Sequence, residues 1–256
     1  MLVESSQWKR MGEGRMISFE NVSKTYGGKT VKAVDSLTWE VPDGKITGFF
    51  GPNGAGKSTA LKMAVGIYAP DEGSIRINGL DIVRDPIEAK RQFGFVSDNP
   101  DRFLRLKGIE YLDFVADVYG VPAERRAPFI EDCGKRLEIY DALANRIQDY
   151  SHGMRQKIMI MGALIHDPSV WILDEPMTGL DPRGAFELKE MMREHAARGK
   201  SVLFSTHVLE VADRLCDQVC IIARGRKLFD GTLDELKAAH PDMSLEQIFL
   251  EMTDHE

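Results

Sequence analysis

The chain has 256 residues, of which 43% are hydrophobic and 29% are charged, and its formal net charge is -7 at pH 7. This composition is typical of a globular protein with a core of ordinary size, and it excludes disordered and collagen-like chains. The longest uncharged apolar run, residues 158–165, is far shorter than the roughly 18 residues that a membrane-spanning helix needs, so we expect no direct membrane insertion.

The first third of the chain has the pattern of β structure interrupted by turns. Residues 1–15 match no element and are expected to form an N-terminal tail. Apolar and polar residues then alternate in three segments, which predicts half-buried strands over residues 16–26, 32–41 and 73–82. Residues 46–50 form an apolar run without alternation, and a glycine-rich turn separates this run from helical spacing over residues 58–67. This order predicts a buried strand, a loop and a helix.

The middle of the chain changes to a helical pattern. Four apolar residues recur at helical spacing and predict the buried face of a first helix: Ile109, Leu112, Val115 and Val118. Pro122 and Pro128 are expected to separate further short helices. We therefore predict an inserted helical subdomain over about residues 98–167.

Strands alternate with helices in the second half of the chain. Three short apolar runs predict buried strands at residues 170–173, 202–205 and 219–223, with helical segments such as residues 186–197 between them. This alternation predicts an α/β fold with a mostly parallel sheet. Residues 245–252 have apolar positions at helical spacing, which predicts a terminal amphipathic helix that packs back on the domain.

The negative charge is concentrated at the C-terminal end. Residues 230–256 contain eight of the 40 acidic residues but only one of the 33 basic residues, so the rest of the chain balances at 32 of each. The chain has no basic stripe, so no nucleic-acid partner is expected. Cys133, Cys216 and Cys220 are too scattered for a disulfide framework, and the sequence shows no secretory leader. Both features favour a reducing cytoplasm.

The strongest motif is GPNGAGKST, in which Gly51, Gly56, Lys57 and Ser58 occupy the fixed positions of a phosphate-binding loop. Glycines let backbone N–H groups approach phosphate oxygens, and the helix that begins near Lys57 adds its positive end. Lys57 is expected to neutralise the β and γ phosphates, and Ser58 to offer its hydroxyl to Mg²⁺. The predicted nucleotide-binding loop comprises Gly51, Pro52, Asn53, Gly54, Ala55, Gly56, Lys57, Ser58 and Thr59.

A pair of carboxylates follows the apolar strand predicted at residues 170–173. The C-terminal ends of strands are where α/β sheets place ligands. Asp174 suits a role in holding Mg²⁺ through water, because that ion prefers oxygen ligands and keeps much of its hydration. Glu175 suits the residue that orients or activates the attacking water. Such a pair on its own is more often a solvated strand end. Together with a phosphate-binding loop in the same chain, a functional role is the better interpretation.

These residues together resemble the ATPase subunits of ATP-binding cassette (ABC) transporters, and the resemblance covers nearly the whole chain. The family signature LSGGQ has a degenerate counterpart, YSHGM, in which Ser151 and Gly153 match, while His152 replaces the first glycine and Met154 the glutamine. Ser151 lies 23 residues before Asp174, which is about the family's spacing. A serine at this position can cap the following helix and direct its N-terminus at a phosphate.

Other family elements follow in order, and one departs from the family pattern. TGLD resembles the D-loop, in which Asp181 helps to join two nucleotide sites, and STH resembles the switch histidine, His207. Tyr26 stands where the family has an aromatic residue that stacks on adenine. Asp98 occupies the place of the family's usual Mg²⁺-facing glutamine and is expected to replace it, although aspartate is shorter and charged.

The resemblance implies a Mg²⁺-dependent ATPase whose cofactors are ATP and Mg²⁺. Residues 16–229 would form the ATPase domain, with an N-terminal antiparallel β portion, and residues 230–256 an acidic C-terminal helical segment. The implied catalytic residues are Glu175, His207 and Lys57, and the metal would be held by Ser58, Asp174 and Asp98. Ser151, His152, Gly153 and Met154 would act on the ATP of the opposite subunit in a dimer.

The implied partners are a membrane-spanning transporter subunit and a second copy of the chain or a homologous ATPase subunit. The chain would lie in the cytoplasm, peripheral at the inner face of the membrane, and residues 245–252 are similar to the closing segment of the drug and antibiotic exporter branch. Two alternatives stay open from the sequence. One is a soluble ABC ATPase that acts on ribosomes or DNA, and the other is a P-loop kinase or nucleotide switch.

Overall fold

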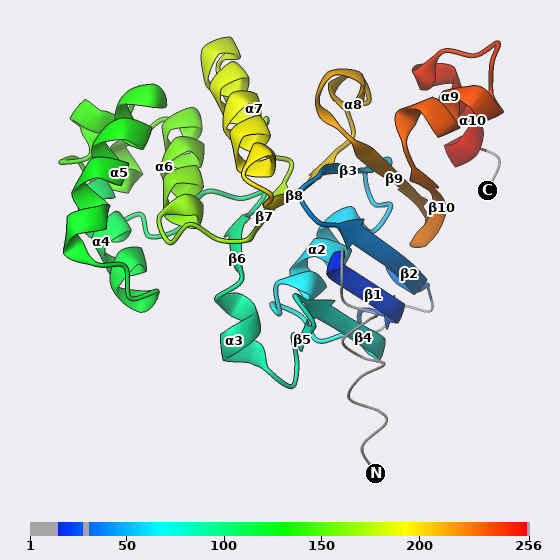
Figure 1. Ribbon diagram of the computed structural model, residues 1–256, viewed down its shortest axis with the longest axis horizontal. Coiled ribbons are helices and arrows are strands. Elements are labelled where there is room, and N and C mark those ends of the chain that lie inside the picture. Colours follow the sequence, from blue (N-terminus) through cyan, green and yellow to red (C-terminus); the bar gives the residue numbers. More distant parts are fainter. Residues whose placement is uncertain (1–14, 28–30, 255–256) are drawn as a thin grey trace.

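A computed structural model describes residues 15–27 and 31–254 of the protein. The predicted N-terminal tail, apart from its last residue, lies outside these described residues. Figure 1 shows a β-rich body between a helical part built from α4, α5 and α6 and a C-terminal pair of helices, α9 and α10. No helix among the described residues has both the length and the apolar character needed to cross a bilayer.

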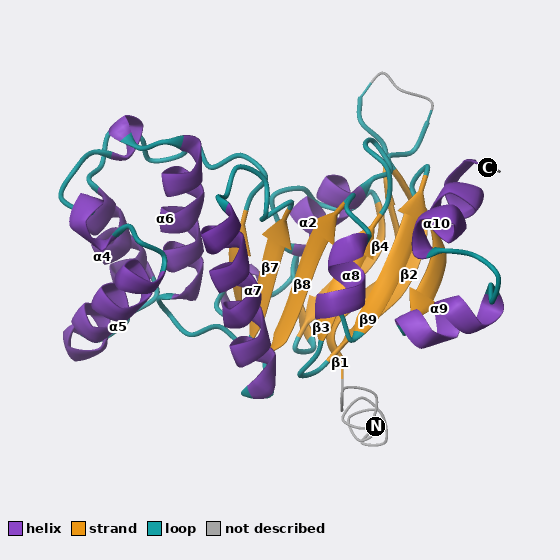
Figure 2. Ribbon diagram, turned by 90° about the horizontal axis from the view of Figure 1, so that it is seen from above, coloured by secondary structure: helices purple, strands orange, loops and turns teal. Residues whose placement is uncertain are grey.

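The central sheet has six strands in the order β10-β9-β3-β8-β7-β6. Five of them are parallel, and only β10 runs antiparallel, to its neighbour β9. Parallel pairing brings the C-terminal ends of β3, β7 and β8 to one edge of the sheet (Figure 2). The strands are β3 (Ile46–Phe50), β6 (Phe93–Val96), β7 (Val170–Asp174), β8 (Ser201–Thr206), β9 (Gln218–Ala223) and β10 (Arg226–Gly231).

A second, antiparallel sheet has the order β2-β1-β4-β5. Its strands are β1 (Arg15–Lys24), β2 (Val34–Pro42), β4 (Glu72–Ile77) and β5 (Leu80–Asp81). The prediction of a single strand over residues 73–82 is wrong, because a tight turn divides this stretch into β4 and β5. Asn78 and Gly79 form that turn with φ values of 50° and 78°, as an Asn-Gly hairpin loop requires.

Alternate side chains of the central strands enter two separate cores. Phe50 of β3 packs with the core shared by the helical part, α7, α8 and α10, whereas Phe49 packs with the antiparallel sheet and α2. In the core next to the antiparallel sheet, the ring of Trp39 stacks on Phe49, at a centroid distance of 4.8 Å, and on Phe19, at 5.5 Å. The helices around the sheets are α2 (Lys57–Ala64), α3 (Pro86–Lys90), α7 (Pro182–Ala197), α8 (Glu210–Leu215), α9 (Leu233–Ala239) and α10 (Leu245–Asp254).

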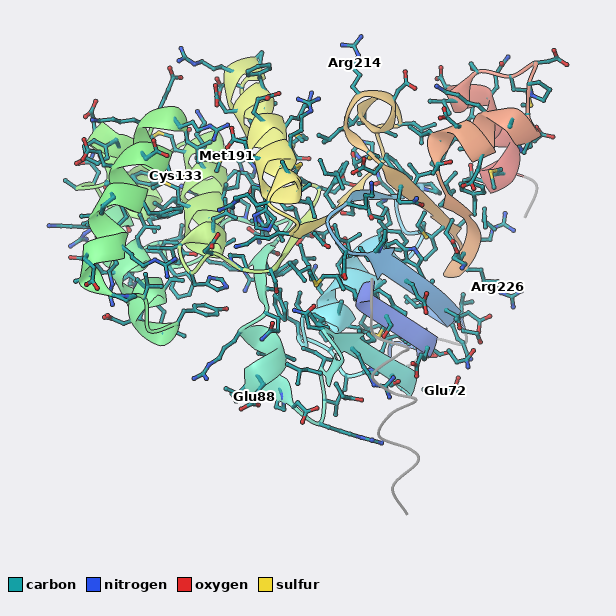
Figure 3. All side chains as sticks on the ribbon, in the orientation of Figure 1. Glu72, Glu88, Cys133, Met191, Arg214 and Arg226 are labelled. Atoms are coloured by element: carbon teal, nitrogen blue, oxygen red, sulfur yellow. The ribbon has the colours of Figure 1, made fainter. Side chains whose placement is uncertain are left out.

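The helical part continues the first of these cores. Cys133 of α5 and Met191 of α7, labelled in Figure 3, both belong to it. Ile248 of α10 is fully buried in the same core, so the expected terminal helix does pack back on the domain. The elements of the helical part are α4 (Gly108–Val118), α5 (Ala123–Arg136), the 3-10 turns Tyr140–Ala142 and Ile147–Asp149, and α6 (His152–Leu164).

Two details of this part differ from the sequence-based expectation. The buried face of α4 includes Tyr111 and Leu112, whereas Val118 is 61% exposed. Tyr111 turns inward because Gly162 of α6 leaves room for its ring: a Cβ on Gly162 would lie 2.4 Å from the tyrosine hydroxyl. Pro128 does not separate two helices but lies inside α5, which continues past it to bury Ile130 in the core.

Candidate functional site

The predicted phosphate-binding loop connects β3 to α2 and depends on glycine at two close backbone approaches. Gly56 has a φ of 108°, and a Cβ on it would lie 2.4 Å from the carbonyl oxygen of Ala33. A Cβ on Gly51 would lie 2.3 Å from the carbonyl oxygen of Ile222. α2 begins directly after Gly56 without a side-chain cap, so N–H groups of its first turn can bind an anion.

Lys57, the first residue of α2, folds back over the loop. Its Nζ donates to the carbonyl oxygens of Gly51 (2.7 Å) and Pro52 (3.2 Å) and lies 3.7 Å from Oε1 of Glu175. Burial lowers the pKa of this ammonium group, although the charges of Glu175 and Asp174 oppose that effect. The lysine is thus positioned between the loop and the carboxylate that follows β7.

Asp174, the last residue of β7, is fully buried and has one unpaired carboxylate oxygen. Its Oδ1 accepts hydrogen bonds from the hydroxyls of Ser58 (3.0 Å) and Ser205 (2.6 Å). Its Oδ2 has no hydrogen-bond partner among the described residues. Burial raises the pKa of the carboxyl group, and the two serine hydroxyls oppose that shift. A buried carboxylate oxygen normally has a partner, so this one points to a group that binds there.

This set of donors fits Mg²⁺. The hydroxyl of Ser58 and the free oxygen of Asp174 are hard oxygen ligands, as that ion prefers. Over the part of the chain that the structure describes, no three His, Cys, Asp or Glu side chains converge into a ready metal cage. Mg²⁺ is commonly held by one or two carboxylates together with water and substrate phosphates, and the site matches that arrangement.

Glu175 has an unusual backbone conformation that directs it toward the loop. Its φ is 48°, a left-handed value that costs a non-glycine residue about 1–2 kcal/mol. The backbone N–H of Glu175 donates to the hydroxyl of Ser205 at 3.0 Å. Oε2 of its carboxylate lies 3.1 Å from Nδ1 of His207. The structure therefore brings the predicted Glu175, His207 and Lys57 together.

Asp98 follows β6 and already has a cationic partner. Its carboxylate lies 3.2 Å from Nζ of Lys62, on α2, and accepts a hydrogen bond of 2.9 Å from the hydroxyl of Ser97. Burial favours a higher pKa for Asp98, but the hydrogen bonds from Ser97 and Lys62 outweigh it, and the net pKa is lowered. Its charge also contributes to the raised pKa of Asp174, so the two carboxylates are electrostatic neighbours.

A cavity of about 680 Å³ joins most of the predicted nucleotide-binding residues. Residues 53–59 of the loop, Tyr26, Asp98 and Glu175 all line it. The Tyr26 hydroxyl lies 3.1 Å from the Thr59 hydroxyl, and its ring meets Tyr68 edge-on at 5.8 Å. Sequence reasoning missed four further lining residues, for which no motif gives a signal: Val31, Lys32, Ala33 and Arg224.

The predicted signature residues begin α6 and are not among the residues that line this cavity. The Ser151 hydroxyl accepts a hydrogen bond of 3.2 Å from the N–H of Met154, which confirms the expected helix cap. His152 and Gly153 lie against Gly179, in the segment predicted as the D-loop. Asp181 caps α7 through the N–H of Gly184 (3.4 Å).

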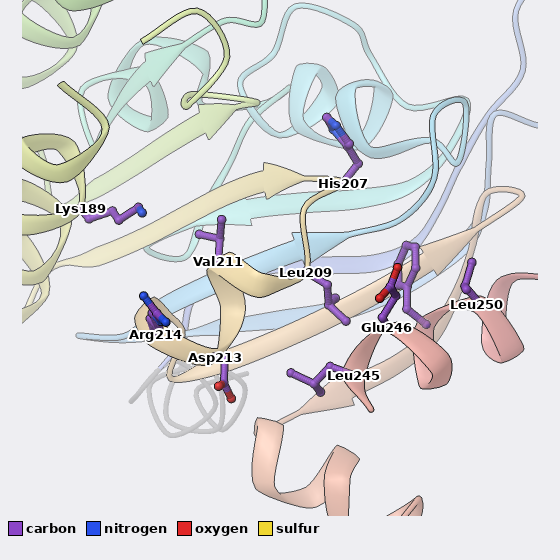
Figure 4. A pocket seen from close by; sticks show the side chains of 10 residues that line it. Lys189, His207, Leu209, Val211, Asp213, Arg214, Leu245, Glu246 and Leu250 are labelled. Atoms are coloured by element: carbon purple, nitrogen blue, oxygen red, sulfur yellow. The ribbon is translucent and has the colours of Figure 1, made fainter. Parts of the chain in front are cut away.

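His207 also borders a second cavity, of about 690 Å³, that lies between α7, α8 and α10. Figure 4 shows His207 on one side of this space and Leu245 and Leu250 of α10 on another. Leu209 and Val211 contribute further apolar surface. The C-terminal helix thus reaches the surroundings of the predicted switch histidine.

Comparisons with known proteins agree with this arrangement. The sequence pattern described as "ABC transporter" matches residues 34–178. The chain is 37% identical to the Nod factor export ATP-binding protein I of Paraburkholderia xenovorans (strain LB400), over 91% of this chain and 76% of that protein. It superposes on a solved ATP-binding subunit of an ABC transporter with a TM-score of 0.87 and 31% identity, covering 93% of this chain and 99% of that one.

A solved dimeric bacterial ABC transporter cassette is also similar. Its TM-score is 0.77 and its identity 26%, over 85% of this chain and 99% of that chain. The match extends well beyond the phosphate-binding loop, so it concerns the whole arrangement of sheets and helices.

Proposed function

Because the chain belongs to the ABC transporter family of ATP-binding proteins, we propose that it hydrolyses ATP to ADP and phosphate to drive an ABC exporter. One observation carries the proposal: the buried Asp174 accepts a hydrogen bond from Ser58 through Oδ1 and leaves Oδ2 unpaired, next to the loop that also fixes Lys57. That combination suits a nucleotide triphosphate bound with Mg²⁺.

The loop and its lysine bind the phosphates in this proposal. Backbone N–H groups at the start of α2 and the ammonium of Lys57 bind the β and γ phosphate oxygens, and Tyr26 contacts the adenine ring. Ser58, Asp174 and Asp98 hold Mg²⁺, directly or through water. When bound, Mg²⁺ neutralises the charge that develops on the transferred phosphoryl group.

Glu175 is the residue that activates water. Its carboxylate accepts the proton of the attacking water, while His207, 3.1 Å away, fixes the orientation of Oε2. The strained backbone and the Ser205 contact hold the side chain toward the cavity that the loop lines. His207 also contacts the γ-phosphate and so reports its loss.

The proposed working form is a dimer, in which each ATP is covered by the opposite subunit. The start of α6 carries Ser151, His152, Gly153 and Met154, and none of them lines the cavity of its own loop, which supports a role toward a second subunit. The dimeric cassette with 26% identity supports the same arrangement. The second subunit is another copy of this chain or a homologous ATPase subunit.

A membrane-spanning subunit is the other proposed partner. The relative from Paraburkholderia xenovorans is named for export, which supports an exporter and disfavours the soluble alternative. We place the chain in the cytoplasm, at the inner face of the membrane, held there by the membrane subunit. Co-purification of the full chain with a membrane protein from detergent extracts tests this part, and recovery of the chain with ribosomes or DNA instead would contradict it.

Phosphate release by the purified chain tests the catalytic part. ATP with Mg²⁺ should give steady turnover, which Lys57→Ala should abolish together with nucleotide binding. Lys189, on the second cavity, offers a matched control: Lys189→Ala should keep the activity. Equal phosphate release by wild type and Lys57→Ala would contradict the assignment of the site.

A further inference from the structure

The helix that begins with the signature residues carries two polar side chains where its other buried positions are apolar or glycine. Buried residues of α6 run from Gln156 to Leu164, and Gln156 and Lys157 are the polar ones. Gln156 is 2% exposed and Lys157 is 8% exposed. Lysine is almost never fully buried unless it is paired, so its partner indicates what it does.

Both buried side chains reach the same short segment. Nζ of Lys157 lies 3.0 Å from Oδ1 of Asp181, and Nε2 of Gln156 donates to the carbonyl oxygen of Pro176 at 3.4 Å. These partners lie at the two ends of residues 176–181, which directly follow Glu175. A backbone hydrogen bond of 3.2 Å from the N–H of Thr178 to the carbonyl oxygen of Glu175 ties the segment to the backbone of the proposed catalytic residue.

The first turn of α6 packs closely against the same segment, residues 176–181, and leaves no room there for an added side-chain atom. A Cβ on Gly153 would lie 2.7 Å from the carbonyl oxygen of Gly179, and a Cβ on Gly179 would lie 2.2 Å from Cδ2 of His152. The histidine that replaces the family's first signature glycine therefore occupies the space that Gly179 leaves open. Gly179 has a φ of 78°, so glycine is required there for the backbone as well.

We propose that Lys157, with Gln156 and His152, is a positioning residue that fixes the first turn of α6 to residues 176–181. This set, the α6 clamp, consists of His152, Gln156 and Lys157 on α6 and their contacts Pro176, Gly179 and Asp181. The inference rests on the proposed function, in which Ser151 and Gly153 contact the ATP of the opposite subunit. Through the clamp, the segment after Glu175 sets the position from which they do so.

A purely stabilising role is a poor explanation for a buried lysine here. The Asp181 side chain is 49% exposed, and ion pairs with an exposed partner usually add only about 0–1 kcal/mol to stability. The ion pair has a geometric effect that an apolar contact lacks, because it specifies which oxygen of Asp181 faces α6 while the same carboxylate caps α7. The clamp therefore joins α6, the segment after Glu175 and the start of α7.

Lys157→Met tests the clamp, since methionine keeps the length and packing of the side chain and removes the charge. In the full chain we expect kcat for ATP hydrolysis to fall by about tenfold, with KM for ATP and nucleotide affinity within about twofold, since Lys157 does not line the cavity. ATP-dependent dimerisation should weaken in parallel. Lys157→Arg should restore most of the rate, and Asp181→Asn, which can still cap α7, should lower it like Lys157→Met.

Arg136→Met is the matched control. Arg136 joins α5 to α7 through Glu187 and Glu194, at 2.8 and 2.6 Å, and these ion pairs do not involve the first turn of α6. The Arg136→Met variant should have a lower midpoint of thermal unfolding than the wild type and an unchanged kcat for ATP hydrolysis. Wild-type kcat in Lys157→Met, or strictly additive losses in the double variant with Asp181→Asn, would overturn the clamp. A wild type without Mg²⁺-dependent hydrolysis would instead contradict the proposed function itself.

Discussion

Nδ1 of His207 lies 3.1 Å from Oε2 of Glu175, and this contact joins the ends of two neighbouring strands, β8 and β7. The other carboxylate oxygen of Glu175 faces Nζ of Lys57 at 3.7 Å. One side chain thus meets the cation of the loop and the predicted switch histidine at the same time. Removal of the Glu175 carboxylate should therefore lower the rate of ATP hydrolysis more than the affinity for the nucleotide.

Glu175→Gln should slow ATP hydrolysis by at least about a hundredfold, because glutamine keeps the shape of the side chain but cannot accept a proton. Nucleotide binding should persist, since the loop and Lys57 are unchanged. Single-turnover phosphate release and size-exclusion chromatography with ATP measure both effects, and the variant should accumulate as an ATP-bound dimer. Turnover at the wild-type rate would contradict the role of Glu175.

Asp174→Asn should weaken the response of the ATPase to Mg²⁺, because it removes the charge of the unpaired Oδ2. We expect the Mg²⁺ concentration for half-maximal rate to rise about tenfold or more and EDTA to abolish turnover in the wild type. Glu88, an exposed acidic residue on α3, gives the control, and Glu88→Gln should keep the wild-type Mg²⁺ curve. An unchanged curve for Asp174→Asn would exclude this metal site.

Asp98→Ala should lower turnover by about tenfold if the carboxylate replaces the family's glutamine. Asp98→Gln, which restores an oxygen of greater reach, should be less damaging than alanine. Lys62→Met separates the ion pair from the carboxylate, since it removes only the partner at 3.2 Å, and should have the smallest effect. Turnover of Asp98→Ala equal to that of the wild type would remove Asp98 from the site.

Gly56→Ala should abolish nucleotide binding, because a Cβ would lie 2.4 Å from the Ala33 carbonyl at a φ of 108°. Gly54→Ala is the control within the same loop. Its φ is also positive, at 82°, but no atom lies within 4 Å of the added Cβ, so it should cost only about 1–2 kcal/mol of stability. Titration with a fluorescent ATP analogue should separate the two, and tight binding by Gly56→Ala would contradict the argument.

Acid should destabilise the fold through His195, which is 1% exposed and whose Nε2 has no hydrogen-bond partner among the described residues. Burial lowers the pKa of His195 to about 4, from an ordinary value of 6.5. The neutral form is favoured in the folded state, so its contribution is complete above pH 6.5 and is lost as the pH falls toward 4. At roughly 1.4 kcal/mol per pKa unit, the loss is about 3 kcal/mol.

Urea titrations between pH 7.5 and 4.5 measure this loss. His195→Leu removes the titrating group, so the free energy of unfolding of that variant should fall less steeply across the same range than that of the wild type. Identical slopes for the two proteins would show that His195 does not supply the acid sensitivity.

Local patterns predicted the parts of the site that one stretch of chain specifies. The loop, its strand and its helix were predicted because glycine spacing and an apolar run adjoin in the sequence, and the structure confirms β3 and α2 around them. The position of Asp174 at a strand end followed in the same way. The Asn78-Gly79 turn was also readable, and only the long alternating pattern around it concealed the hairpin.

Contacts between distant segments were beyond prediction. Lys62 and Asp98 are 36 positions apart, and no periodicity indicates that they pair. The missed lining residue Arg224 reaches the cavity only because β9 pairs with β3. The inward turn of Tyr111 depends on Gly162, a residue of another helix. Such features follow from packing across elements, which the spacing of residues within one element does not encode.

The strands that carry the site differ in the number of neighbouring strands with which they form hydrogen bonds. β3, β7 and β8 each pair with a strand on both sides, whereas β6, which leads to Asp98, lies at one edge of the sheet and pairs, among the described strands, with β7 alone. Amide hydrogens along β6 should accordingly exchange with solvent sooner than those of β3. Asp98, just after β6, therefore has less backbone support than Asp174, at the end of β7, and a mechanical load applied to the segment between β6 and α4 would act on Asp98 first.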